Sequence, residues 1–288
     1  MNIETHLQAC KLEVDRAMEN YFSGQADWPP RLKEAIVYSL KAGGKRIRPI
    51  LAIAACEACG GCRENVMPVA LALEMIHTFS LIHDDLPAMD NDDLRRGLPT
   101  NHKVFGEGLA VLAGDGLLAE AFYLLSQSTS NLEVLRDIAL ATGSAGMVGG
   151  QVLDLEGEGA TLTSIDLEKI HRYKTGRLIT VSVTSGAKIA GAKPSELEAL
   201  KAYGERIGLA FQIADDVLNV EGSREEMGKS IGSDQDNQKA TYPSLLGLED
   251  SKTKARELVE AAILFLKPFG AKSEALSAIA SYIVLRKN

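Results

Sequence analysis

The sequence predicts a single all-α domain spanning residues 1–288, in which many helices surround a central space. Three observations favour this fold. Apolar residues recur at helical spacing along most of the chain, strand-like alternation is nearly absent, and no linker-like or low-complexity segment divides the sequence. The expected helices cover residues 4–22, 31–42, 46–59, 66–86, 109–127, 131–149, 164–190, 195–220 and 251–266.

Turn-forming residues mark the breaks between these segments. W-P-P precedes residue 31, G-G stands at 60–61, and G-E-G stands at 157–159. K-P-S-E at 193–196 is typical of a helix start. The breaks in helical periodicity therefore coincide with residues that favour turns.

Composition excludes some classes of function. Hydrophobic residues make up 45% of the chain and charged residues 24%, which is typical of a globular enzyme. The net charge of −8 argues against a nucleic-acid partner, which would require a basic face. Residues 1–15 are amphipathic and acidic rather than leader-like, so we expect a cytoplasmic protein.

The most apolar window covers residues 66–82. Its length would suit a membrane span, but it contains Pro68, Glu74 and His77. We therefore expect a buried helix and no stable association with a membrane.

Three of the four cysteines form the stretch C-E-A-C-G-G-C. This spacing of Cys56, Cys59 and Cys62 raises the hypothesis of a metal site, but no fourth ligand lies nearby in the sequence. Cys56 and Cys59 also fit the apolar face of one helix. Small core side chains are the better interpretation.

Two double aspartates each follow an apolar helical run. Asp84-Asp85 lies in the stretch 81–97, which reads L-I-H-D-D-L-P-A-M-D-N-D-D-L-R-R-G, and Asp215-Asp216 closes Q-I-A-D-D at 212–216. In the second stretch, Asn219 is four residues after Asp215 and shares its helix face.

Asp90 lies six residues beyond Asp84, and a continued helix would turn it away. Pro87 disfavours helix at Leu86, so a loop can bring Asp90 back towards Asp84.

Adjacent carboxylates repel one another, and a divalent cation turns that repulsion into attraction. Mg²⁺ prefers one or two carboxylates together with water and phosphate oxygens. A solvated acidic loop is the alternative, and it explains Asp92 and Asp93 well. It explains less well why both pairs follow apolar helices. The candidate metal ligands are Asp84, Asp85, Asp90, Asp215 and Asp216.

Basic residues accompany these clusters. G-G-K-R-I-R-P places Lys45, Arg46 and Arg48 at a helix start, where anions bind readily. Further cations are Arg95, Arg96, Lys174, Lys229 and Lys239. Singly, each lysine fits a solvated surface position, but together with acidic metal sites they favour a ligand that carries several phosphates.

The chain resembles the trans-isoprenyl diphosphate synthases, most closely the bacterial farnesyl diphosphate synthases. The resemblance rests on G-G-K-R-I-R-P, on D-D-x-x-x-x-D with R-R-G, on G-D-G-L-L at 114–118 and on G-G-Q-x-x-D at 149–154. It also rests on K-T at 174–175, F-Q-x-x-D-D, and K-A-T-Y-P at 239–243. These blocks cover most of the chain, and no single one would suffice.

This resemblance implies the isoprenoid synthase fold, with a deep central cavity in an all-α homodimer. It implies three Mg²⁺ ions when substrate is bound, with Mn²⁺ as a substitute, held mainly by Asp84, Asp90 and Asp215. Isopentenyl diphosphate would be held by Lys45, Arg48, His77 and Arg96. The allylic diphosphate would be held by Arg95, Lys174, Lys229 and Lys239, with Thr175 and Gln212 stabilising the allylic cation.

The resemblance also suggests the product. The growing tail would run back along the helix that ends in Asp84, so Phe79 and Ser80, five and four residues earlier, would set its length. An aromatic residue at the first position favours a fifteen-carbon product, farnesyl diphosphate. Geranylgeranyl diphosphate is the alternative, and Phe79 could instead be an ordinary core residue.

Three other classes remain for comparison. His83-Asp84 would suit an HD-type metal phosphohydrolase, but no second convincing histidine pair is present. A terpene cyclase would carry a different second acidic motif, and a non-catalytic subunit would be expected to lack the aspartates. The second motif here ends in Asn219 instead of a common Asp, which puts Asn219 in doubt as a direct ligand.

Overall fold

Helices account for almost all of the regular structure. The computed structural model describes residues 2–221 and 240–286. In chain order the described elements are α1 (Ile3–Ser23), α2 (Pro30–Lys41), α3 (Ile47–Ala58), α4 (Arg63–Asp84), β1 (Leu94–Arg95), β2 (Leu98–Pro99), α5 (Asn101–Phe105), α6 (Glu107–Ser128), α7 (Leu132–Thr142), α8 (Met147–Glu156), α9 (Ser164–His171), the π-helical turn η1 (Arg172–Gly176), α10 (Arg177–Ile189), α11 (Pro194–Glu221), α14 (Tyr242–Leu246), α15 (Leu248–Leu264), the 3₁₀ segment η2 (Lys267–Ser273) and α16 (Glu274–Leu285).

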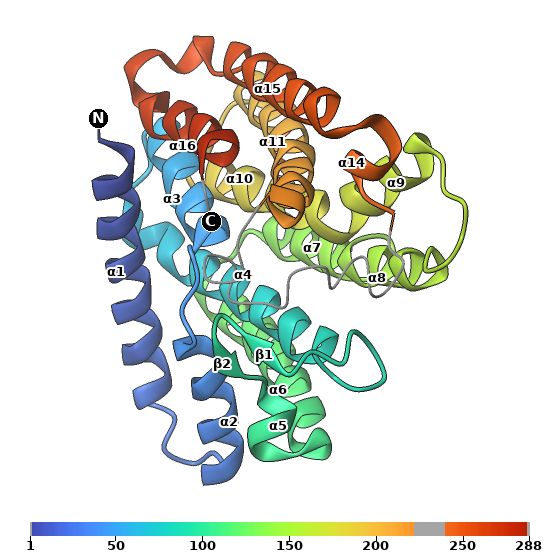
Figure 1. The fold of residues 1–288 in the computed structure, drawn as a ribbon. Helices are drawn as coiled ribbons and strands as arrows, with labels where there is room; N and C mark the ends of the chain where they lie inside the picture. The colour runs from blue at the N-terminus through green and yellow to red at the C-terminus, as the bar shows by residue number, and fades with distance from the viewer. Residues whose placement is uncertain (1, 222–239, 287–288) are drawn as a thin grey trace.

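Helix α4 is the central element of this fold. It contacts α1, α2, α3, α6 and α10, and the other helices are arranged around it (Figure 1). All residues from Val69 to Ile76 are buried, so α4 has no polar stripe in this stretch and must be enclosed on every side. Both α4 and α6 are long and apolar enough to span a membrane by composition alone, but 67% of the apolar stretch of α4 is buried inside the molecule.

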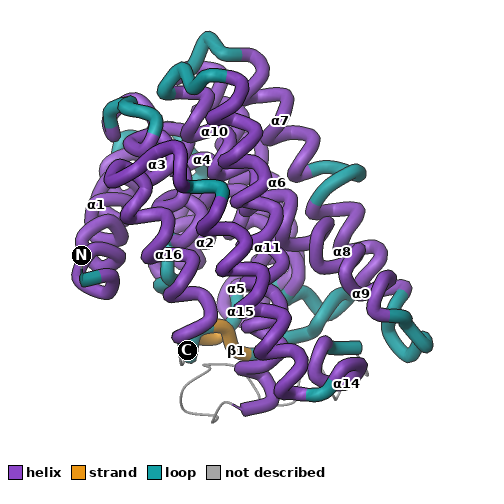
Figure 2. Tube along the Cα trace, turned by 90° about the horizontal axis from the view of Figure 1, so that it is seen from above, coloured by secondary structure: helices purple, strands orange, loops and turns teal. Residues whose placement is uncertain are grey.

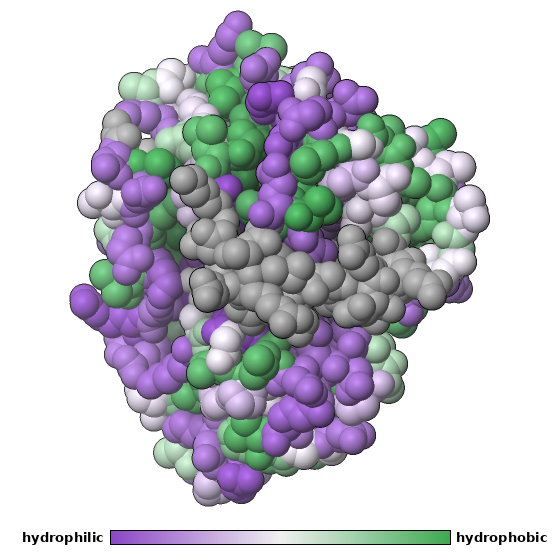
Figure 3. Space-filling view, viewed as in Figure 1, coloured by the Kyte–Doolittle hydropathy of each residue, from purple (hydrophilic) through white to green (hydrophobic). Residues whose placement is uncertain are grey.

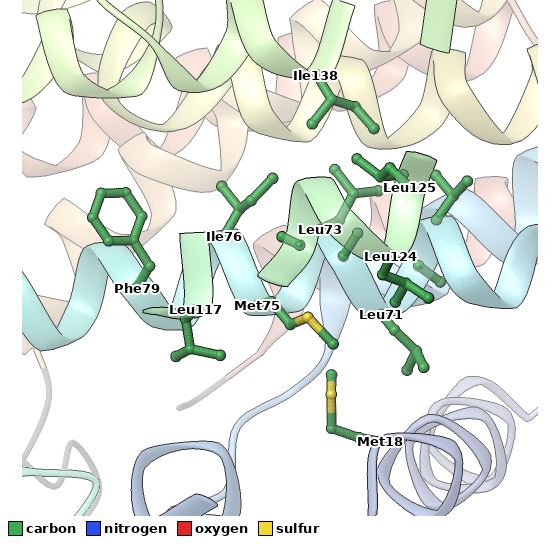
Figure 4. Close-up of a cluster of buried hydrophobic side chains, with 14 of the residues drawn as sticks. Met18, Leu71, Leu73, Met75, Ile76, Phe79, Leu117, Leu124, Leu125 and Ile138 are labelled. Atoms are coloured by element: carbon green, nitrogen blue, oxygen red, sulfur yellow. The ribbon is translucent and has the colours of Figure 1, made fainter. Parts of the chain in front are cut away.

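One large hydrophobic cluster joins α4 to its neighbours. Figure 4 shows Ile76 and Phe79 of α4 on the side that faces Ile138 of α7, with Leu117 of α6 on the other side. Truncating a core residue of this size costs about 2–5 kcal/mol, so the cluster fixes how α4 lies against α6 and α7.

A second cluster lies between α3, α10, α11, α15 and α16. Tyr203 of α11 is fully buried there and donates a hydrogen bond of 2.7 Å to the carbonyl oxygen of Leu276 in α16. The bond satisfies a hydroxyl group that would otherwise be costly to bury. It also fixes the C-terminal helix against the helix that carries Asp215.

The first helix covers one edge of the molecule. Leu7, Cys10, Val14, Met18 and Phe22 of α1 are buried, at the spacing of one helix face. Hydrophilic side chains dominate the outer side of this edge (Figure 3). Helices α8 and α9 lie at the opposite edge (Figure 2).

The predicted helices are largely confirmed, with two corrections. Residues 131–149 do not form one helix, because α7 ends at Thr142 and α8 begins only at Met147, with non-helical backbone at Gly143 and Gly146 between them. Residues 164–190 are helical throughout but include the π-helical turn η1.

Several elements were not predicted at all. They are α16, the two-stranded β1–β2 hairpin, the short helices α5 and α14, and η2. The signal for α16 was present in the sequence, because Leu276, Ile279, Ala280 and Ile283 are buried at helical spacing.

Candidate active site

A cavity of about 1050 Å³ opens beside the end of α4. Its wall combines side chains from α1, α3, α4, the β1–β2 hairpin, η1, α11 and α16. It gathers most of the candidate residues of the sequence: Lys45, Arg48, His77, Asp84, Asp90, Arg95, Arg96, Lys174, Thr175, Gln212 and Asp215. Residues from seven elements thus meet in one cavity.

Asp84 and Asp90 face this cavity together. Helix α4 ends at Asp84, and the chain beyond it turns back, so that the Asp90 N–H donates to the carbonyl oxygen of Asp84 at 2.9 Å. The return loop expected from Pro87 is confirmed. Burial raises the pKa of the Asp84 carboxyl to about 6, and the neighbouring Asp90 adds to the rise while Lys174 opposes it.

Asp85 lies outside the cavity wall. It is buried, and the Arg95 Nε atom donates to both of its carboxylate oxygens at 2.7 and 2.8 Å. The Arg95 Nη2 atom lies 2.5 Å from Oδ1. The second aspartate of the motif is therefore paired with the hairpin that follows it.

In the second double aspartate, too, one residue faces the cavity and the other is buried. Asp215 lines the cavity, and the Arg286 Nη2 atom lies 2.5 Å from its Oδ1 atom. Asp216 is buried and accepts from the Tyr242 N–H at 2.9 Å. Asn219 follows one turn later in α11 but is not part of the cavity wall.

The π-helical turn η1 brings Lys174 and Thr175 to the cavity. Lys174 Nζ donates to Asp154 Oδ2 at 2.6 Å, and Thr175 Oγ1 lies 2.7 Å from Gln212 Oε1. Helix α8 lies directly on this turn, since a side chain at Gly150 would collide with the Lys174 backbone. This close approach explains the glycine in G-G-Q-x-x-D. Single π-helical turns are frequent at functional sites.

A cationic group forms the other side of the cavity. Burial lowers the pKa of Lys45 to about 8 and that of Arg48 to about 10, because the charged forms lose solvation. Burial together with the nearby arginines holds the pKa of His77 well below its ordinary value, so this imidazole is neutral at pH 7. The buried Arg48 Nε atom has no hydrogen-bond partner among the residues that the structure describes. These features fit an anionic ligand.

Arg46 has a structural role instead. Its guanidinium is buried and pairs with Glu74 and Asp15 at 2.7 Å each, and it also donates to the carbonyl oxygen of Leu40 at 2.6 Å. The sequence placed Arg46 with Lys45 and Arg48 at a helix start that suits anions. Arg46 does line the cavity, but these three contacts engage its guanidinium within the protein.

Arg286 and α1 were underestimated from the sequence. The side chain of Arg286 is only 2% exposed and stacks over the Phe211 ring at 4.1 Å. Glu4, Gln8 and Lys11 of α1 also reach the cavity wall. No local motif indicates such contacts, because each depends on helices distant in sequence.

The remaining candidates lie elsewhere. Phe79 packs in the core, where its ring meets His83 edge-on at 4.9 Å, and Ser80 donates to the carbonyl oxygen of His77 at 2.9 Å. Lys229 and Lys239 lie outside the described residues. Cys56 is buried and Cys62 is exposed, so only part of the cysteine stretch belongs to the core.

Within residues 2–221 and 240–286, no three His, Cys, Asp or Glu side chains converge closely enough to hold a metal ion by themselves. Asp84, Asp90 and Asp215 instead offer single carboxylates to one cavity. Such a donor set fits Mg²⁺ ions that share their coordination with phosphate oxygens of a ligand.

Known proteins are similar to this chain over almost its whole length. The polyprenyl synthetase family model matches residues 29–280. The chain belongs to the polyprenyl synthetase family. It is 48% identical to a farnesyl diphosphate synthase of Geobacillus stearothermophilus, over 99% of this chain and 98% of that protein. It is 51% identical to a geranylgeranyl diphosphate synthase of Cyanophora paradoxa, over 90% of this chain and 89% of that protein.

Solved structures agree with this membership. The crystal structure described as an FPP/GFPP synthase from Zymomonas mobilis superposes with a TM-score of 0.86 at 40% identity, covering 98% of this chain and 99% of that one. The predicted isoprenoid synthase fold is confirmed. As a member of the polyprenyl synthetase family, the chain is a prenyltransferase of the trans-prenyl diphosphate synthase class.

Proposed function

We propose that this protein condenses isopentenyl diphosphate with dimethylallyl diphosphate, and then with geranyl diphosphate, to give (2E,6E)-farnesyl diphosphate and pyrophosphate. One observation carries the proposal. The cavity combines carboxylates from two helix segments, Asp84 with Asp90 and Asp215, with a separate group of buried cations. Two substrates that each carry one diphosphate match these two groups.

Different residues would bind each of the two substrates. Lys45, Arg48 and Arg96 would bind isopentenyl diphosphate through charge-assisted hydrogen bonds, with neutral His77 beside them. Lys174 would bind the allylic diphosphate, and Arg95 would contact it while holding Asp85. Lys229 and Lys239 are proposed for the same diphosphate on the resemblance alone.

Mg²⁺, when bound, neutralises the allylic diphosphate and favours its departure as pyrophosphate. Asp84, Asp90 and Asp215 would hold the ions, and we propose three of them, with Mn²⁺ as a substitute. Thr175 and Gln212 would direct oxygen atoms at the carbon that becomes positive. The double bond of isopentenyl diphosphate would attack that carbon, which forms the new C–C bond and leaves a tertiary cation on the isopentenyl unit. The released pyrophosphate would take a proton from the adjacent C2 carbon, and a new double bond forms there.

The product length rests on Phe79. Farnesyl and geranylgeranyl diphosphate synthases are both among the similar proteins, so similarity alone does not decide between fifteen and twenty carbons. Five residues of helix separate Phe79 from Asp84, or about 7.5 Å along α4. A bulky ring at that depth would stop a tail that grows along α4, which favours farnesyl diphosphate.

A product assay tests both parts of this proposal. The protein would be incubated with Mg²⁺, labelled isopentenyl diphosphate and dimethylallyl diphosphate, and the chain length of the products measured. We expect mainly fifteen carbons. Simple diphosphate hydrolysis or a cyclic hydrocarbon would contradict the assignment.

Phe79→Ala should lengthen the products if the ring forms the floor. Phe22→Ala removes another buried ring, from α1, and serves as a control for general loosening of the core. An unchanged product in Phe79→Ala would leave Phe79 a packing residue.

We also propose that the protein is a homodimer. Apolar side chains of α6 are exposed, with Leu112 and Tyr123 each 57% and Val111 39% accessible. A second copy of the chain would cover this face. Light scattering on Leu112→Asp compared with the unaltered protein would test it, since a charge at a buried dimer contact should give a smaller particle.

A further inference from the structure

A chain of polar contacts runs from the cavity wall to buried Asp216. Thr175 Oγ1 lies 2.7 Å from Gln212 Oε1, and Gln212 Nε2 lies 3.5 Å from Asp216 Oδ1, a long hydrogen bond. Thr175 and Gln212 line the cavity, whereas Asp216 is only 4% exposed. Successive helix residues point about 100° apart, so Asp216 diverges from its cavity-facing neighbour Asp215.

The other carboxylate oxygen of Asp216 is occupied from the far side. The Tyr242 N–H donates to Oδ2 at 2.9 Å, and His171 Nε2 lies 3.3 Å from the same oxygen without hydrogen-bond geometry. The His171 ring stacks on the Tyr242 ring at 5.5 Å. Because these groups surround Oδ2, Oδ1 is the oxygen that faces Gln212.

Donor and acceptor chemistry fixes the direction of the hydrogen bonds that link Thr175, Gln212 and Asp216. A carboxylate only accepts hydrogen bonds, so Gln212 must present its NH₂ group to Asp216. The Gln212 carbonyl oxygen then faces Thr175, whose hydroxyl must donate to it. The lone pairs of Thr175 Oγ1 are therefore left for the cavity, where the cation is expected to form.

We propose that Asp216 is a positioning residue rather than a metal ligand, and that it acts through Gln212 to direct the lone pairs of Thr175 at the reacting carbon of the allylic diphosphate. This inference rests on the proposed function and assigns a different task to the second aspartate of the motif. A dipole that is oriented in advance stabilises a developing charge without rearranging during the reaction.

Asp216→Asn tests the direction of these hydrogen bonds without changing the shape of the side chain at position 216. The Tyr242 N–H still requires an acceptor, so the Asn carbonyl takes the place of Oδ2 and its NH₂ group faces Gln212. Gln212 must then flip, and the Thr175 proton turns towards the cavity. We expect kcat to fall at least about tenfold, while KM for both diphosphates stays within about twofold.

The double variant Asp216→Asn with Gln212→Glu should restore the original direction of the Thr175 hydrogen bond. A carboxylate at position 212 accepts both from the amide introduced at position 216 and from the Thr175 hydroxyl, so Thr175 donates again. We expect kcat to recover at least about tenfold relative to Asp216→Asn. Gln212→Glu alone faces Asp216 with a second carboxylate and should be less active than the double variant. An unchanged kcat in Asp216→Asn, or no recovery in the double variant, would overturn the proposal.

A binding measurement separates this role from metal ligation. Calorimetry with Mg²⁺ and inorganic pyrophosphate should give Asp216→Asn an affinity within about twofold of the unaltered protein, while Asp215→Asn loses about tenfold or more. An equal loss in both variants would make Asp216 a ligand and overturn the inference. If neither variant loses affinity, the metal assignment of the proposed function fails instead, and the rescue still decides the role of Asp216.

Discussion

The two double aspartates share a division of labour but differ in how their charges are balanced. In each pair the first residue, Asp84 or Asp215, faces the cavity and the second is buried. Asp85 is balanced by the guanidinium of Arg95, whereas Asp216 is held mainly by uncharged donors. A repeated Asp-Asp motif therefore does not mean that both aspartates serve as metal ligands in each copy.

The first residues of the pairs differ as well. Asp84 stands at the C-terminal end of α4, where the helix dipole disfavours negative charge, and it has the second carboxylate of Asp90 beside it. Asp215 lies six residues before the end of α11 and is paired with Arg286. Negative charge thus accumulates at the first cluster and is partly neutralised at the second. Changes at the first cluster should have the larger effects.

Asp84→Ala should have the largest effect of all. Losing a ligand for the ions that stabilise the departing pyrophosphate should cost about 5 kcal/mol, or nearly four orders of magnitude in turnover. Asp93→Ala is a matched control in the same loop, since Asp93 is exposed and its carboxylate pairs with Lys103. Steady-state turnover with saturating Mg²⁺ measures both. Near-normal turnover in Asp84→Ala would remove the metal role.

Arg95→Ala should destabilise the fold by about 3–5 kcal/mol, because it removes the guanidinium that balances the charge of the buried Asp85 carboxylate. Denaturant unfolding of the metal-free protein measures this loss. The double variant Asp85→Leu with Arg95→Met removes both charges and should recover most of the lost stability.

At the second cluster, His171→Ala should lower the free energy of unfolding by only about 1–3 kcal/mol, since Asp216 keeps the hydrogen bond from the Tyr242 N–H. Equal losses at the two clusters would contradict the comparison.

The sequence predicted the cavity-facing half of each cluster but not the buried half. Helical spacing and Pro87 were enough to place Asp84, Asp90 and Asp215, because those arguments are local. The pairing of Asp85 with Arg95 was missed, and the two were assigned to different ligands. The contact of Arg286 with Asp215 joins residues that are far apart in the chain, and only the packing of α16 against α11 brings them together.

Asp84→Asn should stabilise the metal-free protein at pH 8. The folded pKa of Asp84 is raised to about 6 from 3.8, so the ionised carboxylate weakens folding at every pH above 6, by at most about 3 kcal/mol. As the pH falls towards 4, the folded state takes up the proton first and this penalty disappears. The gain from Asp84→Asn should therefore shrink by about 1 kcal/mol between pH 8 and pH 5. Unfolding curves at the two pH values measure it, and a constant gain would contradict the shift.

Arg286→Ala should have the smallest effect, and its sign is the informative part. In the metal-free protein Arg286 lies where a cation would approach Asp215, and this carboxylate is partly exposed, so the pair is worth about 1 kcal/mol or less. Removing Arg286 should let Mg²⁺ and inorganic pyrophosphate bind at a concentration up to about fivefold lower, as measured by calorimetry. Arg286→Lys keeps the charge and should bind as the unaltered protein does. Weaker binding in Arg286→Ala would mean that Arg286 contacts the pyrophosphate itself, and the second cluster would then be a mixed site of carboxylate and guanidinium rather than a weaker copy of the first.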